Sequence, residues 1–159
     1  MNTASDGATE QEAYRLLTKT FILLDDCDRR FFSEYGLSTR QFWAIQHLDE
    51  QQGCSMVDLS RVLFTDKSNV TGIVDRLESL KLVARTTDPR DRRIILITLT
   101  EEGRRLRDRV NEQHDMRIRE LMHLDNSAAI NISSLVEHLH IISSNIETYL
   151  EQTIGKQTA

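Results

Sequence analysis

The sequence contains few of the residues on which several common protein designs depend. Among its 159 residues are two cysteines, one proline and six glycines. The cysteines, Cys27 and Cys54, form no CxxC pair, and two of them do not make the disulfide framework of a small secreted domain. The glycines form neither a GxGxxG nor a GxxxxGK[ST] pattern. Neither a disulfide scaffold nor a phosphate-binding loop is therefore expected.

The sequence also lacks a long hydrophobic run. No apolar stretch approaches the roughly 18 residues needed to cross a bilayer. Residues 1–7 are polar, without the charged start and apolar core of a signal peptide. With 39% hydrophobic and 28% charged residues, the composition fits one folded domain or one domain with a helical extension. We expect a cytoplasmic protein with no membrane partner.

Catalytic and metal-binding patterns are absent as well. No Ser-His-Asp set or pair of catalytic carboxylates can be argued from the sequence. The five histidines have no metal-ligand spacing. We therefore expect a protein that is not an enzyme and holds neither a metal nor a cofactor.

Charge is unevenly distributed along the chain. The net charge is −5, but residues 54–100 carry eight Lys and Arg against six Asp and Glu. The segments on either side are acidic. Because the local field governs association with DNA, the acidic total does not exclude a DNA-binding surface in the middle segment.

Hydrophobic spacing predicts four helices, a β-hairpin and two further helices. Residues 1–9 are expected to be a disordered lead-in. The first helix covers 10–35, and a second begins after Ser38 and ends at Gly53. Shorter helices follow Ser55 and the pair Thr65 and Asp66, strands cover 82–87 and 94–99, and the last two helices begin at 101 and about 127, the latter ending near 153.

The hairpin turn is the most informative segment. Asp88-Pro89-Arg90-Asp91-Arg92-Arg93 combines turn-forming residues with three arginines. The flanking Ile, Leu, Val and Thr residues favour strands. The preceding helix has an apolar stripe at Val70, Ile73, Val74, Leu77 and Leu80. A helical region followed by an arginine-tipped hairpin predicts a mainly α fold, a winged helix-turn-helix with a small β-hairpin wing.

These segments in this order resemble the MarR family of bacterial transcription regulators. The matching motifs are Leu37-Ser38-Thr39-Arg40-Gln41-Phe42, Asp58-Leu59-Ser60-Arg61, Ser68-Asn69-Val70-Thr71-Gly72-Ile73-Val74-Asp75-Arg76-Leu77-Glu78, the hairpin turn, and Leu99-Thr100-Glu101-Glu102-Gly103. The resemblance implies a homodimer on a pseudo-palindromic operator, usually a repressor released by a small molecule or an oxidant. Residues 37–100 would then be the DNA-binding domain, and residues 10–36 and 101–154 the helical dimerisation region.

One residue departs from the family pattern. Lys81 stands where glycine is usual, just after the recognition helix, which contains the motif Ser68–Glu78. A lysine there must adopt left-handed backbone, at a cost of roughly 1 kcal/mol or more, or the corner must be built differently.

The predicted DNA contacts lie on the recognition helix and the wing. They are Lys67, Ser68, Asn69, Thr71, Arg76, Arg90 and Arg92. Asn, Ser and Thr can bond bases or phosphates, and a guanidinium at the wing tip suits the narrow minor groove. Asp91 is expected to pair with a neighbouring arginine and so hold the wing loop, and Arg93 is expected to stabilise the loop as well. The alternative is an ordinary solvated helix face and a hairpin with incidental arginines.

Two hypotheses concern regulation. An aromatic or phenolic effector would bind a pocket lined by Phe21, Phe32, Phe42, Trp43 and His47, since family members often bind such compounds between the DNA-binding and dimer parts. The same aromatic residues could equally be plain core.

The second hypothesis is a redox sensor using Cys27, because sensing cysteines of the family's organic-peroxide sensors also lie on the first helix. Asp25, Asp26 and Asp28 surround Cys27 and disfavour a reactive thiolate. A winged-helix module that binds protein is a further alternative.

Overall fold

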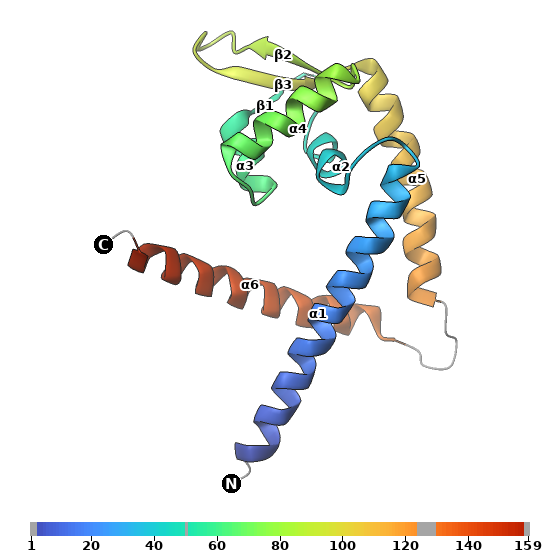
Figure 1. Cartoon of the computed structure of the whole chain (residues 1–159), viewed down its shortest axis with the longest axis vertical. Coiled ribbons are helices and arrows are strands. Elements are labelled where there is room, and N and C mark those ends of the chain that lie inside the picture. Colours follow the sequence, from blue (N-terminus) through green and yellow to red (C-terminus); the bar gives the residue numbers. More distant parts are fainter. Residues whose placement is uncertain (1–2, 50, 124–129, 158–159) are drawn as a thin grey trace. The chain divides into compact units, whose positions relative to one another are not determined.

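The computed structural model describes residues 3–49, 51–123 and 130–157. The chain divides into two compact units, Met1–Ile118 and Arg119–Ala159. The first unit contains α1 (Thr3–Ser33), α2 (Thr39–Gln46), β1 (Cys54–Ser55), α3 (Met56–Val62), α4 (Lys67–Ser79), β2 (Val83–Thr87), β3 (Ile95–Leu99) and most of α5 (Glu101–His123). The second contains the end of α5 and α6 (Ile132–Gln157). Figure 1 labels these elements.

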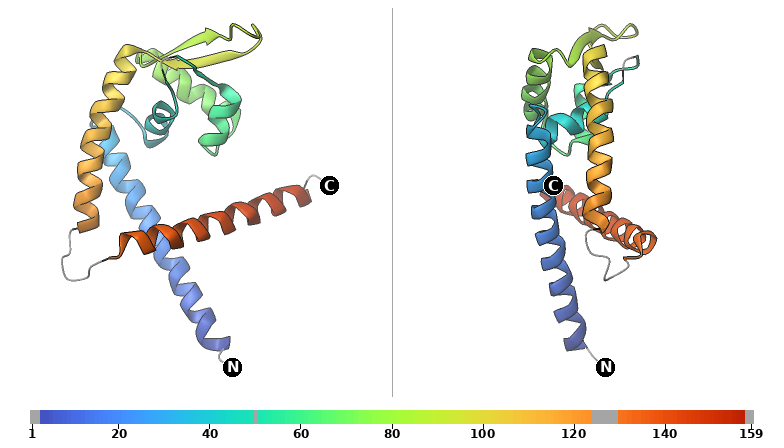
Figure 2. Two further views of the ribbon diagram at one scale, coloured as in Figure 1. Left: turned by 180° about the vertical axis from the view of Figure 1, so that it is seen from behind. Right: turned by 90° about the vertical axis from the view of Figure 1, so that its right-hand side faces the viewer.

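The first unit is a winged helix-turn-helix. Helices α3 and α4 form the helix-turn-helix, and the antiparallel hairpin β2–β3 follows α4. In Figure 1 and Figure 2 the loop end of this hairpin projects away from the helices. The predicted fold class, mainly α with a small hairpin wing, is confirmed.

The core of this unit lies where α1, α2, α3, α4, the sheet and α5 meet. Its largest fully buried side chains are Phe32, Phe42, Ile45, Leu59, Val70, Val74, Leu77, Ile97 and Val110. Two aromatic rings, Phe32 from α1 and Phe42 from α2, stack with centroids 4.3 Å apart. The apolar stripe of α4 thus packs inward, which turns its polar face outward.

A third strand was not predicted. Cys54 and Ser55 pair antiparallel with Ile97 and Leu96, which gives the sheet the order β1-β3-β2. A two-residue strand leaves no periodic pattern in the sequence. Its partner strand, more than 40 residues away, is what makes it a strand.

The second helix is shorter than predicted. It begins with the expected Ser38 cap, whose hydroxyl accepts from the Gln41 amide, but it ends at Gln46 instead of Gly53. The Asp49 carboxylate then accepts hydrogen bonds from the amides of Gln52 and Gln51 at 2.6 and 2.7 Å. These donors hold the pKa of Asp49 below its ordinary value. A short acidic side chain that bonds nearby amides competes with helix continuation.

The terminal helices also differ from their predicted bounds. Helix α1 begins at Thr3, so residues 3–9 are helical where a disordered lead-in was expected. Adding turns to an existing helix costs little, because each added residue gains a hydrogen bond. Helix α6 begins at Ile132, after an Asn131 side chain that accepts from the Ser134 amide at 3.0 Å. The predicted start near residue 127 lies outside the described residues.

The corner after α4 is built with left-handed backbone at Lys81, whose φ is 60°. The Lys81 amide donates to the Glu78 carbonyl at 2.8 Å, and the Leu82 amide donates to the Leu77 carbonyl at 3.0 Å. This is the hydrogen-bond pattern that usually ends a helix at glycine. The Thr100 hydroxyl donates to the Lys81 carbonyl at 2.7 Å, which ties the corner to the start of α5.

Candidate nucleic-acid interface

The recognition helix α4 presents a continuous polar surface. The five side chains of α4 that are predicted to contact DNA are all exposed: Lys67, Ser68, Asn69, Thr71 and Arg76. On the opposite side Val70, Val74 and Leu77 are completely buried. The separation follows from the helical period, since residues three and four apart share a face. The surface therefore offers hydrogen-bonding groups and two cations to the outside of the protein.

Two of these side chains are held by local hydrogen bonds. The Asn69 amide nitrogen donates to the Thr65 hydroxyl at 3.2 Å. The Thr71 hydroxyl donates to the Lys67 carbonyl at 3.0 Å. Such contacts limit the rotamers of both side chains, so their remaining polar atoms are directed before any partner binds.

The wing loop is organised by its two aspartates. The Asp88 carboxylate accepts from the Arg90 amide at 2.7 Å, and the Asp91 carboxylate accepts from the Arg93 amide at 3.0 Å. The Ile94 amide donates to the Asp91 carbonyl at 2.9 Å. Asp91 thus contacts the loop backbone, whereas an ion pair with a neighbouring arginine was expected.

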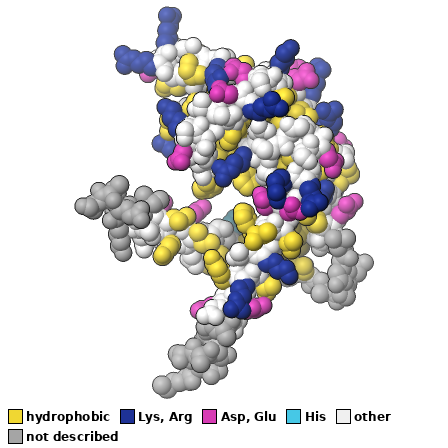
Figure 3. All heavy atoms as spheres, viewed as in Figure 1, with side chains coloured by type: hydrophobic (Ala, Val, Ile, Leu, Met, Phe, Trp, Pro, Cys, Tyr) yellow, Lys and Arg dark blue, Asp and Glu magenta, His cyan; other side chains and the backbone are white. Residues whose placement is uncertain are grey.

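The three loop arginines, Arg90, Arg92 and Arg93, are all exposed. Dark blue side chains gather at the hairpin end in Figure 3. Because the Asp88 and Asp91 carboxylates bond to loop amides, the loop backbone is held while the three guanidinium groups remain at its surface. This arrangement can place a cation in a narrow, negatively charged groove.

A residue that sequence reasoning missed, Arg85, joins the wing to the recognition helix. Its guanidinium on β2 forms ion pairs with Asp75 at 2.5 Å and with Glu78, both on α4. The hydrogen bond that Arg85 donates to Asp75, with the added charge of Glu78, raises the pKa of Arg85 above its ordinary value. The available signal was a pair of acids three apart on the outer side of α4, followed by an arginine in the next strand.

A groove of about 490 Å³ lies between the start of α3, the recognition helix and the wing strands. It is lined by Ser55, Met56, Val57, Lys67, Thr71, Arg85, Arg93, Ile94 and Ile95. This groove brings together two residues singled out from the sequence, Lys67 on α4 and Arg93 in the wing loop. A slot with cationic and hydroxyl groups can hold an anionic chain that passes between the helix and the wing.

The five residues proposed for an effector pocket differ in how far they are buried. Phe32 and Phe42 belong to the core, whereas Phe21 and Trp43 are 66% and 45% exposed. His47 is also exposed. None of the five lines the groove between α3, α4 and the wing.

A histidine set aside by sequence reasoning lies beside the two core aromatics. The His114 ring from α5 stacks on Phe31 with centroids 5.3 Å apart, and its Nε2 lies 3.2 Å from Asp28 Oδ1. This pair, together with an Arg107 guanidinium that donates to the Leu48 carbonyl at 2.9 Å, connects α5 to α1 and to the segment after α2.

The cysteines are free thiols, and both are half-buried. Burial, with help from Asp58 and Asp49, raises the pKa of the Cys54 thiol. Cys27 lies on α1 among the aspartates noted in the sequence.

No helix within the described residues is long and apolar enough to cross a membrane.

The segment that carries this surface is similar to a known protein family. A model of the MarR family matches residues 35–94, which span α2 to the end of the wing loop. The uncharacterised HTH-type transcriptional regulator YsmB of Bacillus subtilis (strain 168) is 30% identical over 114 residues, which cover 70% of this chain and 78% of YsmB. The chain belongs to the MarR family.

Two solved structures extend the similarity over most of this MarR-family protein. AbsC, a MarR-family regulator from Streptomyces coelicolor, is 25% identical with a TM-score of 0.75 and covers 88% of this chain and 95% of its own. BpsR from Bordetella bronchiseptica, whose DNA binding is regulated by 6-hydroxynicotinic acid, is 25% identical with a TM-score of 0.68 and covers 82% and 89%. The MarR-family protein described here is accordingly a transcriptional regulator, and its relatives are regulators rather than enzymes.

Proposed function

We propose that this protein is a homodimeric repressor that binds a pseudo-palindromic operator and is released by a small aromatic or phenolic effector. The observation that carries the proposal is the coupling of two DNA-contacting elements. The polar face of α4 and the arginine-tipped wing are joined through Arg85. A recognition helix in the major groove and a wing in the adjacent minor groove need such a fixed relation.

Dimerisation is supported by apolar side chains that remain exposed in one chain. On α1 these include Tyr14, Leu16, Phe21, Ile22 and Leu23, and on α6 Val136, Ile141, Ile146, Tyr149 and Leu150. Figure 3 shows hydrophobic side chains on the visible surfaces of both helices. Exposed apolar area of this extent is typical of an association surface. A second copy of the chain is the occupant we propose.

The dimer would set the distance between recognition helices. Two such helices must lie about 34–36 Å apart to enter successive major grooves on one face of DNA. An effector bound between the dimer helices and the DNA-binding lobes would change that distance and release the operator. The regulation of BpsR by an aromatic acid supports this class of effector. Of the predicted pocket residues, the exposed Trp43 and His47 remain accessible to a ligand.

The deciding experiment is fluorescence anisotropy of the protein on labelled duplex from upstream of its own gene, compared with duplex of unrelated sequence. We expect tighter binding to the upstream duplex and a steep dependence on salt, because phosphate contacts release counterions. Addition of aromatic acids or their thioesters should then release the upstream duplex. Equal, weak binding to both duplexes would contradict the proposal and favour a protein-interaction module.

The same titration separates the redox alternative. Organic peroxide would release DNA from a thiol sensor, and a Cys27→Ser variant would lose that response. We expect peroxide to have no effect, since the Cys27 thiol is half-buried on α1.

A wing-tip variant tests the DNA-contacting geometry. Arg90→Ala should weaken operator binding by roughly 1–3 kcal/mol while the dimer stays intact. Arg109→Ala removes the same charge from an exposed position of α5 and serves as the matched control. Unchanged operator affinity in Arg90→Ala would remove Arg90 from the interface.

A further inference from the structure

The recognition helix contains a glycine that the fold does not require. Gly72 lies in the interior of α4, where glycine destabilises a helix relative to alanine. Apart from its chain neighbours and the backbone of its own helix, a Cβ built on Gly72 meets no atom within 4 Å, so the space there is open. Gly103 in α5 is the opposite case, since a Cβ there would lie 2.0 Å from the Leu82 carbonyl oxygen. Packing explains Gly103 and leaves Gly72 unexplained.

Gly72 occupies the outward side of α4. Helical spacing places it one turn from Ser68 and one turn from Arg76, both exposed. The buried residues Val70, Val74 and Leu77 point the other way. Because Gly72 has no side chain, the helix surface is recessed between these two predicted DNA contacts. A ligand can therefore approach the backbone of α4 closely at Gly72.

A groove of about 400 Å³ lies beside Gly72, on the α2 side of the recognition helix. Its lining consists of Arg40, Gln41, Thr65, Asn69, Gly72 and Ile73. Arg40, in the first turn of α2, is exposed and is the only charged side chain of this lining. Gln41 is fixed by the capping box, because its side chain accepts from the Ser38 amide at 2.8 Å. The groove thus has one cation, otherwise uncharged walls and no carboxylate.

We propose that this groove seats the sugar–phosphate backbone of one DNA strand, with Arg40 neutralising a phosphate and Gly72 allowing the strand to lie against α4. The proposal rests on the proposed DNA-binding function and extends it to α2. Continuity with Asn69, a predicted contact, and the single cation favour a DNA strand as the occupant. The seat lies on the Arg40 side of α4, whereas the groove toward the wing is lined by Lys67, Arg85 and Arg93.

The glycine is tested by measurements with opposite signs. Gly72→Ala should raise the melting temperature by about 1–4 °C, because alanine favours the helix and fits the open space. The same variant should lower operator affinity by about tenfold, since each protomer brings an added methyl group against the DNA. Ser79→Thr adds a methyl group at the exposed end of α4 and should leave operator affinity unchanged.

The cation is tested by salt dependence. Arg40→Ala should weaken binding to operator and unrelated duplex by the same factor. The slope of log affinity against log salt should fall by about 0.9 for each protomer, the value for one lost phosphate contact. Arg109→Ala, with the same charge change on α5, should retain the wild-type slope at the operator.

The outcomes separate the two proposals. If the wild-type protein binds operator and unrelated duplex equally, the proposed function is wrong, and so is the proposed DNA-strand site beside Arg40 and Gly72. Wild-type protein that binds its operator, together with either variant binding as tightly as wild type, overturns the seat alone. A lower melting temperature for Gly72→Ala would also overturn it, because the fold itself would then require the glycine.

Discussion

Lys81 shows how one residue can carry a cost that its neighbours compensate. Its left-handed φ of 60° is unfavourable for a side chain with a Cβ. The helix-ending bonds to Glu78 and Leu77, together with the Thr100 hydroxyl on the Lys81 carbonyl, hold the corner in place. The sequence predicted either left-handed backbone at Lys81 or a differently built corner. The structure has left-handed backbone there.

The strain at Lys81 predicts a stabilising substitution. Lys81→Gly should raise the free energy of unfolding by about 1 kcal/mol, because glycine adopts positive φ without a Cβ clash. Lys81 is exposed, so the change removes little packing. Urea denaturation of both proteins measures the difference. Lys81→Ala retains the Cβ and should show no gain; equal stability of the glycine variant and wild type would show that the corner is unstrained.

At the scale of elements, the wing and the recognition helix are connected by charge. Arg85 lies on β2, and its partners Asp75 and Glu78 lie on α4. Half-exposed ion pairs contribute little individually, but this network fixes a strand against a helix. Its value therefore lies in the position of the wing.

A double-mutant cycle measures that connection. Arg85→Met, Asp75→Asn and the double variant should give a coupling of about 0.5–1 kcal/mol in urea denaturation, because either single change removes the Arg85–Asp75 ion pair. A matched cycle with Arg61 and Asp58, an i,i+3 pair within α3, should give a smaller value. Additive effects of Arg85 and Asp75 would mean that the pair does not hold the wing.

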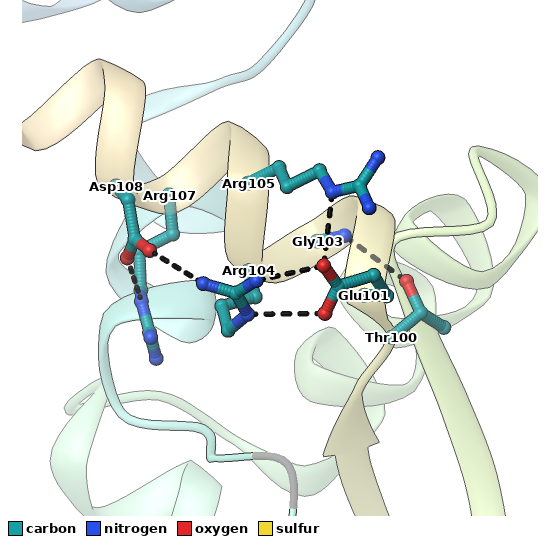
Figure 4. A network of polar contacts seen from close by, with 7 residues as sticks. All are labelled: Thr100, Glu101, Gly103, Arg104, Arg105, Arg107 and Asp108. Atoms are coloured by element: carbon teal, nitrogen blue, oxygen red, sulfur yellow. Dashed lines mark hydrogen bonds and ion pairs between the residues drawn. The ribbon is translucent and has the colours of Figure 1, made fainter.

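The start of α5 contains a second charged cluster, which Figure 4 shows from close by. The Arg104 guanidinium donates two hydrogen bonds to the Glu101 carboxylate, and the Arg105 Nε donates one at 2.9 Å. The Thr100 hydroxyl caps the helix by accepting from the Gly103 amide at 3.0 Å. Hydrogen bonds from Arg104 and then Arg105 lower the pKa of Glu101 to about 2.

This lowered pKa predicts a pH dependence. A carboxyl with a depressed folded-state pKa stabilises the fold above its unfolded pKa, here 4.5, and loses that contribution as pH falls toward about 2. Glu101→Gln should therefore be less stable than wild type at pH 6, and the difference should shrink between pH 4.5 and 2. Urea midpoints at several pH values check this. Because Glu101 is exposed, salt should also reduce the difference, and a constant difference across pH would exclude the ionised carboxylate as its cause.

At the scale of the whole molecule, the exposed apolar face of α6 is the feature that one chain does not explain. Ile146 and Tyr149 are 54% and 68% exposed on this helix. The sequence predicts an apolar seam on this helix from steps of four and three residues, and Ile146 and Tyr149 both belong to it. The seam consists of Leu135, Leu139, Ile142, Ile146, Tyr149 and Thr153. A seam exposed in this way is expected of a helix that pairs with another copy.

Charging this seam should separate the proposed dimer. Ile146→Asp should give monomers in sedimentation velocity and weaken operator binding strongly, because burying an unpaired carboxylate in an apolar contact is costly. Asn145→Asp adds the same charge to the neighbouring exposed residue and should remain dimeric. A dimeric Ile146→Asp would place the self-association surface elsewhere.

The sequence by itself determined the helix order, the hairpin and the polar face of α4. Each depends on residues close together in the chain: the stripe at Val70, Val74 and Leu77, the Asp-Pro turn, and the caps at Ser38, Ser55 and Thr100. Helical and strand periods translate such spacing directly into faces. The DNA-contact residues proposed on α4 and the wing follow from the same local patterns.

Only the tertiary structure decided the features that join distant residues. These are the pairing of Cys54 and Ser55 with β3, the ion pairs of Arg85, and the groove between Arg40 and Gly72. It also separated the proposed pocket residues into buried Phe32 and Phe42 and exposed Phe21 and Trp43. The helical or strand period shows which face a side chain occupies. The residues that it contacts there belong to elements distant in the sequence, so only the tertiary structure shows them.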